Sequence, residues 1–293
     1  MKSVHAGTLD IAYGDHGPAD GTPVVLLHGF PYDHRAYDEV AAILARERLH
    51  CLLPCLRGFG ATRFLNESTP RSGQQAALAA DLLAFLDALS IPRAMLGGYD
   101  WGGRAACILA ALWPERVRGL VSCGLGYNIQ DIANAWHPAP PDEEARYWYM
   151  YYFNSRRGVA GLAANRRDLC RHLWELWSPS WRFQPTTFDR TAVSFDNPDF
   201  VDVVIHSYRH RFANAPGDPA FDELEARLAR QPDIAVPTVV LQGRDDGVDP
   251  PGENDPARPH FTGPYRRRIL DGVGHNLPQE APDEFAAAIL SLL

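Results

Sequence analysis

An acidic residue, Asp100, stands at the centre of the glycine-rich segment GGYDWGG (97–103), directly after the apolar run AML. The small residues on both sides permit a tight turn from a strand into a helix. Gly98 and Gly102 keep the spacing of the G-x-S-x-G turn, which normally presents a serine nucleophile. A carboxylate is already ionised at neutral pH, so Asp100 can attack an electrophilic saturated carbon and form an ester.

Hydrolysis of such an ester requires a base that activates water, and the turn motif places an acid and then a histidine later in the chain. Both residue types follow apolar runs that are typical of strands. The segment LQGRDDG supplies Asp245 and Asp246, and GVGHNLPQE supplies His275. Asp-Gly turns and lone histidines are common, but all three groups in this order at strand ends indicate a catalytic triad.

The elements that must position these groups alternate along the chain. Helix 74–89 has apolar residues at the spacing of one helix face, and the strands are short apolar runs. This alternation predicts an α/β fold in which a mostly parallel sheet is flanked by helices on both faces. The expected strands are 23–29, 49–55, 93–100, 117–124, 237–243 and 266–272, and the other expected helices are 102–114 and 282–293.

The middle of the chain differs, because clear strands vanish there and aromatic, helix-like segments such as YWYMYYF and FVDVVIHSYRHRF take over. We expect residues 127–231 to form an inserted helical cap. The core is then made of residues 1–126 and 232–293. Open α/β sheets bind ligands at the carboxyl edge of their strands, so the cap is expected to cover that edge.

Composition excludes several classes of protein. A net charge of −8 with only short basic clusters argues against a nucleic-acid partner. No apolar run reaches the ~18 residues that a membrane span needs, and the first residues show no secretory signal. The odd count of five cysteines in apolar segments predicts buried, reduced thiols and a cytoplasmic protein.

No metal and no organic cofactor is expected. The chain has no CxxC pair, and the pair His206 and His210 lacks the intervening Glu and the third ligand of a zinc site. The expected partner is therefore a small apolar organic substrate, and a homodimer is left open.

The residues resemble the epoxide hydrolase and haloalkane dehalogenase group of the α/β-hydrolase superfamily, and epoxide hydrolases most closely. The resemblance implies an α/β-hydrolase fold with an oxyanion hole built from the amides of Phe30 and Trp101. In this group the acid lies three residues after the glycine that ends its strand, which selects Asp246 over Asp245. The matching segments are HGFP (28–31), RGFG (57–60), YDWGG (99–103), WPERVRGLV (113–121) and GVGHNLPQEAPDEF (272–285).

Epoxide hydrolases use two cap tyrosines as hydrogen-bond donors to the epoxide oxygen. The segments YMYYFNSRRGVA and HSYRHRF resemble the two tyrosine motifs and imply that Tyr149 and Tyr208 are these donors. A neutral phenol suits the role, because ring opening places negative charge on that oxygen. Aromatic packing is the alternative reading of either tyrosine. Trp148 and Phe153 are expected to line an apolar substrate pocket.

The expected activity is opening of an epoxide to a vicinal diol through an ester on Asp100, which water activated by His275 hydrolyses. A haloalkane or haloacid dehalogenase with the same Asp-His-Asp triad is the alternative. Trp101 could hold a halide, but Phe30 replaces the usual Asn, and Arg104 alone makes a poor clamp for a haloacid carboxylate. A non-catalytic binding protein of this fold has no need of a complete triad.

Overall fold

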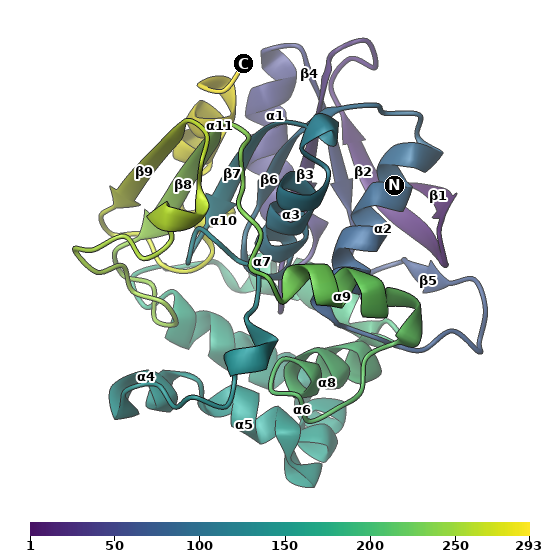
Figure 1. The fold of residues 1–293 in the computed structure, drawn as a ribbon, viewed down its shortest axis with the longest axis vertical. Coiled ribbons are helices and arrows are strands. Elements are labelled where there is room, and N and C mark those ends of the chain that lie inside the picture. Colours follow the sequence, from purple (N-terminus) through teal and green to yellow (C-terminus); the bar gives the residue numbers. More distant parts are fainter.

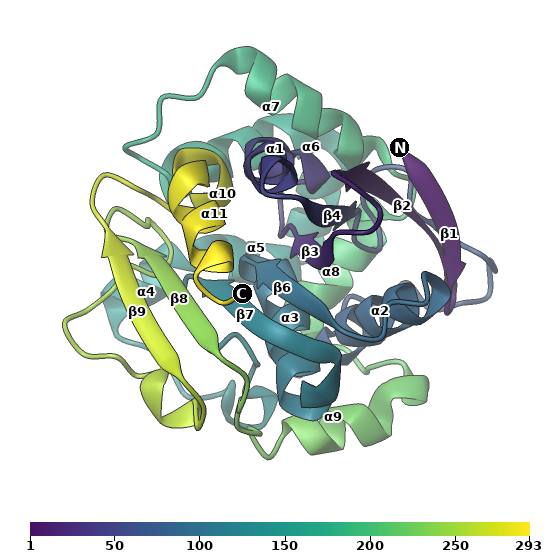
Figure 2. The same cartoon turned by 90° about the horizontal axis from the view of Figure 1, so that it is seen from above.

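A nine-stranded mixed sheet forms the centre of the molecule, whose computed structural model describes residues 1–293 (Figures 1 and 2). The strand order is β1-β2-β4-β3-β6-β7-β8-β9, and the short β5 pairs with β2. Strands β3, β4 and β6 to β9 are parallel neighbours, whereas β2 is antiparallel to each of its partners. The strands are β1 (Lys2–Ala6), β2 (Leu9–His16), β3 (Thr22–Leu27), β4 (Leu49–Pro54), β5 (Arg63–Phe64), β6 (Ala94–Gly98), β7 (Val117–Cys123), β8 (Thr238–Gly243) and β9 (Tyr265–Leu270).

Helices cover both faces of this sheet (Figure 2). Helices α1 and α11 pack against each other and against β4 and β7, and α2 and α3 pack together on the opposite face. Because the central strands are buried on both sides, they read as continuous apolar runs such as VVLL in β3. The helices are α1 (Asp38–Arg46), α2 (Gln75–Ala88), α3 (Asp100–Leu112), α4 (Pro141–Arg146), α5 (Trp148–Asn154), α6 (Arg156–Trp177), α7 (Pro185–Ala192), α8 (Phe200–His210), α9 (Asp222–Leu228), α10 (Leu277–Glu280) and α11 (Pro282–Leu290).

The helices between β7 and β8 form a separate layer, in which α4, α5, α6 and α8 lie together below the sheet in Figure 1. Side chains fasten this layer to the loops that leave the strands. The indole N–H of Trp174 in α6 donates to the carbonyl of Pro31 at 2.8 Å, and Arg71 pairs with Asp199 at 2.8 Å. Helix α9 instead contacts α2 of the core. The exact limits of the predicted cap, 127 and 231, stay a prediction.

The expected α/β class is confirmed by the mostly parallel sheet with helices on both faces. All five cysteines are free and buried, as expected from their apolar surroundings. None of the helices combines the length and the apolar character needed to span a membrane.

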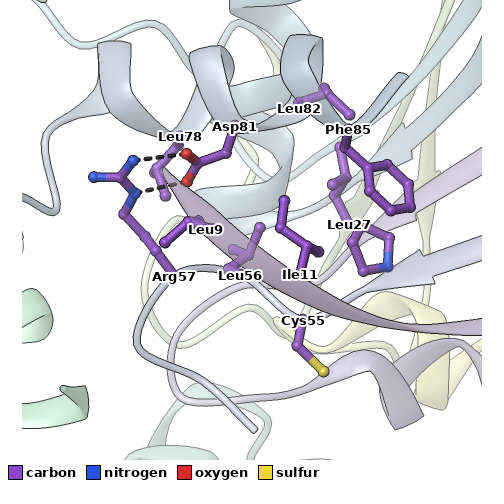
Figure 3. Close-up of a pocket in the computed structure, with 11 residues that line it drawn as sticks. Leu9, Ile11, Leu27, Cys55, Leu56, Arg57, Leu78, Asp81, Leu82 and Phe85 are labelled. Carbon is purple, nitrogen blue, oxygen red and sulfur yellow. Dashed lines mark hydrogen bonds and ion pairs between the residues drawn. The ribbon is translucent and has the colours of Figure 1, made fainter. Parts of the chain in front are cut away.

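A buried ion pair joins the loop after β4 to helix α2 (Figure 3). The guanidinium of Arg57 donates to both carboxylate oxygens of Asp81, at 2.6 and 2.7 Å, and to the carbonyl of Ser72 at 2.8 Å. Burial raises the pKa of Asp81, although the charge of Arg57 acts in the opposite direction. Bidentate geometry with a further acceptor is what a buried ion pair needs to be tolerated, so this pair fixes the RGFG loop beside the sheet.

Replacing Asp81 with Ala should lower the free energy of unfolding by about 3–5 kcal/mol, because it leaves the Arg57 guanidinium buried without its counter-charge. Urea unfolding followed by tryptophan fluorescence measures the change. The matched control is Asp87→Ala on the same helix, since Asp87 pairs with Arg116 but its side chain is 60% exposed. That control should cost less than about 1 kcal/mol. Equal losses in the two variants would contradict a structural role for the buried pair.

Candidate active site

Asp100 is the first residue of α3 and stands two residues after the end of β6. Its φ of +49° is rare for a residue with a side chain, so the turn holds Asp100 in a strained conformation. Helix α3 also approaches β3 closely, because a Cβ on Gly102 would collide with the carbonyl oxygen of Leu27. The glycines of the segment therefore allow the helix to start immediately beside the central strands and to carry the carboxylate at their edge.

The loop after β3 holds this carboxylate. The amide N–H of Phe30 donates to Oδ1 of Asp100 at 2.6 Å, and Oδ2 takes no part in this hydrogen bond. The loop is itself fixed by His28, whose Nε2 accepts from the amide of Leu56 at 3.0 Å. Burial lowers the pKa of His28 to about 4, so its imidazole is neutral and can accept this bond.

Trp101 follows Asp100 in the first turn of α3, where helix amides have no acceptor within the helix. These amides and the helix dipole favour negative charge at this end of the helix. The indole N–H of Trp101 is buried and has no hydrogen-bond partner. Phe30 stacks on Trp101 with ring centroids 5.9 Å apart, so the two residues expected to form the oxyanion hole are neighbours.

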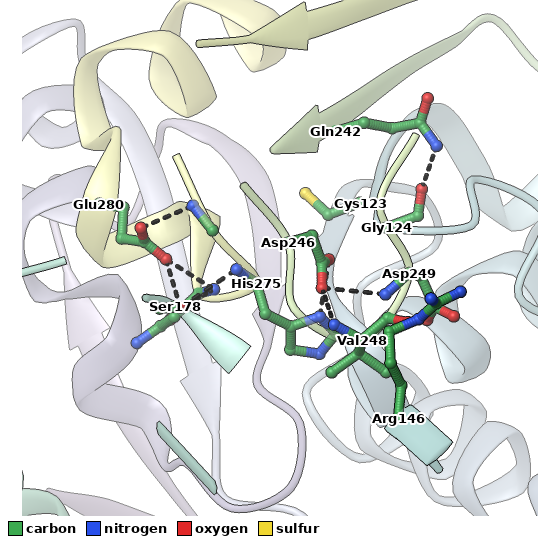
Figure 4. Close-up of polar contacts among 12 residues, drawn as sticks. Cys123, Gly124, Arg146, Ser178, Gln242, Asp246, Val248, Asp249, His275 and Glu280 are labelled. Carbon is green, nitrogen blue, oxygen red and sulfur yellow. Dashed lines mark hydrogen bonds and ion pairs between the residues drawn. The ribbon is translucent and has the colours of Figure 1, made fainter. Parts of the chain in front are cut away.

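His275 and Asp246 meet on the loops that follow β9 and β8 (Figure 4). Nδ1 of His275 lies 2.8 Å from Oδ2 of Asp246. The other carboxylate oxygen, Oδ1, accepts from the amides of Val248 at 2.8 Å and Asp249 at 3.1 Å. Asp245, the second candidate for the acid, bonds to Ser180 instead. The structure therefore pairs the histidine with Asp246.

The end of α6 fastens the histidine loop. The amide of His275 donates to the carbonyl of Trp177 and to Oγ of Ser178, both at 3.1 Å. Ser178 in turn donates to Glu280 at 2.6 Å, and the same carboxyl accepts from the amide of Gly274 at 2.7 Å (Figure 4). Sequence reasoning missed these partners, because Ser178 lies nearly a hundred residues before the histidine.

Negative charges surround the imidazole of His275. Burial lowers its pKa, but the charge and the hydrogen bond of Asp246 outweigh burial, and Asp100 and Asp249 add to them, so the pKa rises to about 9. The imidazole is therefore protonated at neutral pH. Loss of the Asp100 charge would lower the pKa of His275.

Asp100 and His275 open onto one cavity of about 300 Å³. Its wall is more polar than the expected apolar pocket, because it includes two arginines and two further acids. Tyr147 donates to Oδ1 of Asp249 at 2.7 Å on this wall. The lining residues from the core are Asp100, Arg104, Cys123, Gly124, Leu125, Val248, Asp249 and His275, and those from the helical layer and its connection are Tyr127, Asn128, Ile129, Gln130, Asp131, Tyr147, Tyr149, Met150 and Arg211.

The two expected donor tyrosines lie side by side, with ring centroids 5.6 Å apart and rings nearly perpendicular. Tyr149 lines the cavity, whereas Tyr208 lies against Phe30 and Trp101 and does not contribute to the cavity wall. Burial raises the pKa of both phenols, and the charge of Asp100 acts in the same direction. Both are therefore neutral donors at physiological pH.

The two residues expected to bind substrate lie outside the cavity wall. Trp148 is partly buried against Tyr152 and His172. Phe153 is fully buried and contacts Phe30 and Tyr208, so it supports the site from behind. Their direct contact with substrate stays a prediction.

The histidine pair His206 and His210 lies away from this cavity. The rings stack 5.6 Å apart, and Nδ1 of His206 accepts from the amide of Gly73 at 3.0 Å. No group of three or more His, Cys, Asp or Glu side chains is arranged to hold a metal ion. The pair instead joins α8 to the loop before α2.

Comparison with known proteins agrees with this architecture. The model of the alpha/beta hydrolase fold family matches residues 22–282, and the chain belongs to that family. It is 28% identical to epoxide hydrolase A of Mycobacterium tuberculosis, over 93% of this chain and 91% of that protein. It is also 35% identical to haloalkane dehalogenase 2 of Mycobacterium bovis, over 96% of this chain and 90% of that protein.

Among solved structures, a Klebsiella pneumoniae protein provisionally described as an epoxide hydrolase superposes on this chain with a TM-score of 0.96. The two are 46% identical, and the match covers 99% of this chain and 96% of that chain. The expected α/β-hydrolase fold and the expected resemblance to epoxide hydrolases and haloalkane dehalogenases are thus confirmed.

The charge on Asp100 should control the titration of His275. In Asp100→Asn the pKa of His275 should fall below its wild-type value of about 9, because one of the negative charges that raise it is gone. NMR titration of the imidazole, assigned by comparison with His275→Gln, measures the shift. Asp245→Asn is the control, since Asp245 bonds to Ser180, and should leave the pKa unchanged.

The raised pKa also sets the sign of a stability effect. The protonated imidazole contributes to the free energy of unfolding fully below pH about 6.5, and this contribution is lost as the pH rises through about 9. A stability profile of His275→Gln that falls as steeply as the wild-type profile over this window would contradict the assignment.

Proposed function

We propose that this protein hydrolyses epoxides to vicinal diols through a covalent ester on Asp100. The observation that carries the proposal is the bond between the amide of Phe30 and Oδ1 of Asp100. This oxygen becomes the carbonyl oxygen of the ester when Oδ2 attacks carbon. The donor that stabilises the later oxyanion is therefore already in contact with it, which is the preorganisation that acyl chemistry requires.

In the first step, Oδ2 of Asp100 forms a bond to one epoxide carbon, and the carbon–oxygen bond of the ring breaks. Tyr149 and Tyr208 hold the epoxide oxygen and supply the proton that it gains. The product is a hydroxyalkyl ester of Asp100. Because the carboxylate charge is consumed, the pKa of His275 falls, and its imidazole gives its proton through solvent to the phenolate that ring opening leaves.

In the second step, neutral His275 takes a proton from water, and the hydroxide attacks Cγ of Asp100. The amides of Phe30 and Trp101 stabilise the oxyanion. Asp246 orients the imidazole through Nδ1 and balances its positive charge. Collapse of the intermediate breaks the bond between Cγ and the ester oxygen, and the hydroxyl proton of the intermediate passes to the leaving alkoxide. The diol leaves, the carboxylate is restored, and His275 is again protonated, as in the resting enzyme.

Dehalogenation is the second candidate, and the buried indole N–H of Trp101 favours it. This donor has no partner and lies directly after the nucleophile, where a departing halide would need stabilisation. The similarity to a haloalkane dehalogenase over most of the chain points the same way. Against it, Phe30 provides no side-chain donor as the second halide contact, whereas the tyrosine pair suits an epoxide oxygen.

His275→Gln should trap the ester, because alkylation of Asp100 does not need the base but hydrolysis does. The variant is incubated with neutral and charged epoxides and, separately, with a bromoalkane and bromoacetate, and its intact mass is measured. An adduct with the whole mass of an epoxide, absent in Asp100→Ala, is expected. If only the bromoalkane or bromoacetate labels the protein, with release of bromide, dehalogenation becomes the supported activity in place of epoxide hydrolysis. If no compound labels the protein, both activities are contradicted.

Removing both phenols should slow ring opening strongly. Tyr149→Phe combined with Tyr208→Phe should reduce kcat/KM for epoxides by about 10²–10⁴, the usual contribution of a positioned proton donor. Steady-state kinetics measure the loss. Tyr151→Phe is the matched control, because Tyr151 belongs to the same helix as Tyr149 but is 44% exposed. Full epoxide activity in the double variant would show that the pair serves packing alone.

A further inference from the structure

Two arginines from distant parts of the chain line the cavity beside Asp100. Arg104 comes from α3 and Arg211 directly follows α8. The structure gives neither guanidinium an ion-pair partner. Nε of Arg104, and Nε and Nη2 of Arg211, are buried without any hydrogen-bond acceptor. Cationic donors are rarely left buried and unpartnered, because the lost hydration is not replaced.

We propose that Arg104 and Arg211 form a subsite for an anionic group of the substrate, and that the enzyme acts on short epoxides that carry a carboxylate. The anion subsite rests on the two arginines alone, whereas the choice of an epoxide as substrate rests on the proposed function. A carboxylate would give the free N–H groups of both arginines the acceptors that the protein does not provide.

The burial of Arg104 argues that the site is built for a ligand. Arg104 is only 8% exposed, yet it lines the cavity. Burial and the neighbouring charge of Arg211 lower the pKa of Arg104 to about 10, so it is still a cation at neutral pH. Two like charges are thus held close together, an arrangement that an anion between them would relieve.

The acids in the same cavity do not take this place. Asp131 is exposed and accepts from the backbone and side-chain amides of Asn134. Asp249 is engaged by the hydroxyl of Tyr147, and burial raises its pKa to about 6. Asp100 has Oδ1 bound to the amide of Phe30, and its other oxygen is needed for attack on carbon. The guanidinium of Arg211 makes one hydrogen bond, from Nη1 to the sulfur of Met150 at 3.3 Å.

The position of the arginines limits the length of the substrate. Arg104 lies four residues after Asp100 on the same helix, so their side chains leave the same face about one turn apart, roughly 5–6 Å. The guanidinium of Arg211 lies over the ring of Tyr208, 4.5 Å from its centroid. The bound anion would therefore be only a few bonds away from the attacked carbon of the same substrate molecule. It would also lie close to Tyr208, the expected hydrogen-bond donor to the epoxide oxygen.

The cavity volume supports a small substrate. At about 300 Å³ it is at the lower end of typical ligand pockets, about 300–1,000 Å³. We infer that the carboxylate is attached to the epoxide ring itself or to the next carbon. Arg104 alone would be a poor clamp for a carboxylate. In the folded protein, Arg211 lines the same cavity and supplies a second guanidinium.

The first experiment compares trans-2,3-epoxybutanoate with trans-2,3-epoxybutanamide, which has the same shape but no charge. The wild-type enzyme should prefer the acid by about 10- to 100-fold in kcat/KM, as expected for lost charge-assisted hydrogen bonds. Arg104→Gln and Arg211→Gln should each remove most of this preference. Equal turnover of the two compounds by the wild type, or an undiminished preference in both variants, would overturn the subsite.

The matched control is Arg157→Gln, which removes the same charge from an exposed position on α6 and should keep the full preference. If the arginines only adjust the charge of Asp100, both compounds lose rate equally in the variants and the preference survives, which also overturns the subsite. Arg211→Lys keeps the charge but loses the planar fork, so it should retain part of the preference. If Arg104→Gln fails to fold, the Arg211 variants decide the question.

A second measurement separates this inference from the proposed function. Titration calorimetry with butanoate and butanamide needs no turnover, and butanoate should bind about 10-fold or more tightly, with the difference lost in Arg211→Gln. Butanoate selectivity without hydrolysis of either epoxide would uphold the subsite and overturn epoxide hydrolysis for these compounds. Hydrolysis of both epoxides at equal rates, without butanoate selectivity, would uphold epoxide hydrolysis and overturn the subsite.

Discussion

The close approach of α3 to the central strands is the constraint on which the rest of the site depends. Asp100 is held at a positive φ, and Gly102 fits against the carbonyl of Leu27 only because it has no side chain. This contact brings the carboxylate to the loop after β3, where the amide of Phe30 meets it. A strained residue persists only where its surroundings determine it fully, and here the buried sheet and the His28 loop do so.

The second organising feature is the balance of charge in and around the cavity that Asp100 and His275 line. Three carboxylates, from Asp100, Asp246 and Asp249, raise the pKa of His275 to about 9. Two arginines line the same cavity as Asp100 and Asp249. In a buried site the effective dielectric constant is low, so a change in one charge strongly shifts the pKa values of the neighbouring groups. In the proposed mechanism, esterification of Asp100 removes one of these charges and lowers the pKa of the imidazole for the following step.

Much of this arrangement could be predicted from sequence, because local patterns specify it. The strand of 49–55 and the helix of 74–89 agree with β4 and α2 within one residue, and the Asp100 turn follows from its glycines. The N-terminal hairpin was not predicted, since both of its strands mix polar with apolar residues and lack a continuous apolar run. Arg211 and Asp249 reach the cavity only through long-range packing, which no local pattern encodes.

The attachment of α6 to the histidine loop has a consequence for protein engineering. The carbonyl of Trp177 accepts from the amides of both His275 and Gly247, and Ser178 adds a further bond to the histidine loop. The helical layer and the loops that carry acid and base are thus one mechanical unit. A chimera that exchanged the whole layer to change substrate range would also displace the imidazole, unless the donor sequence retained the turn at residues 177–178.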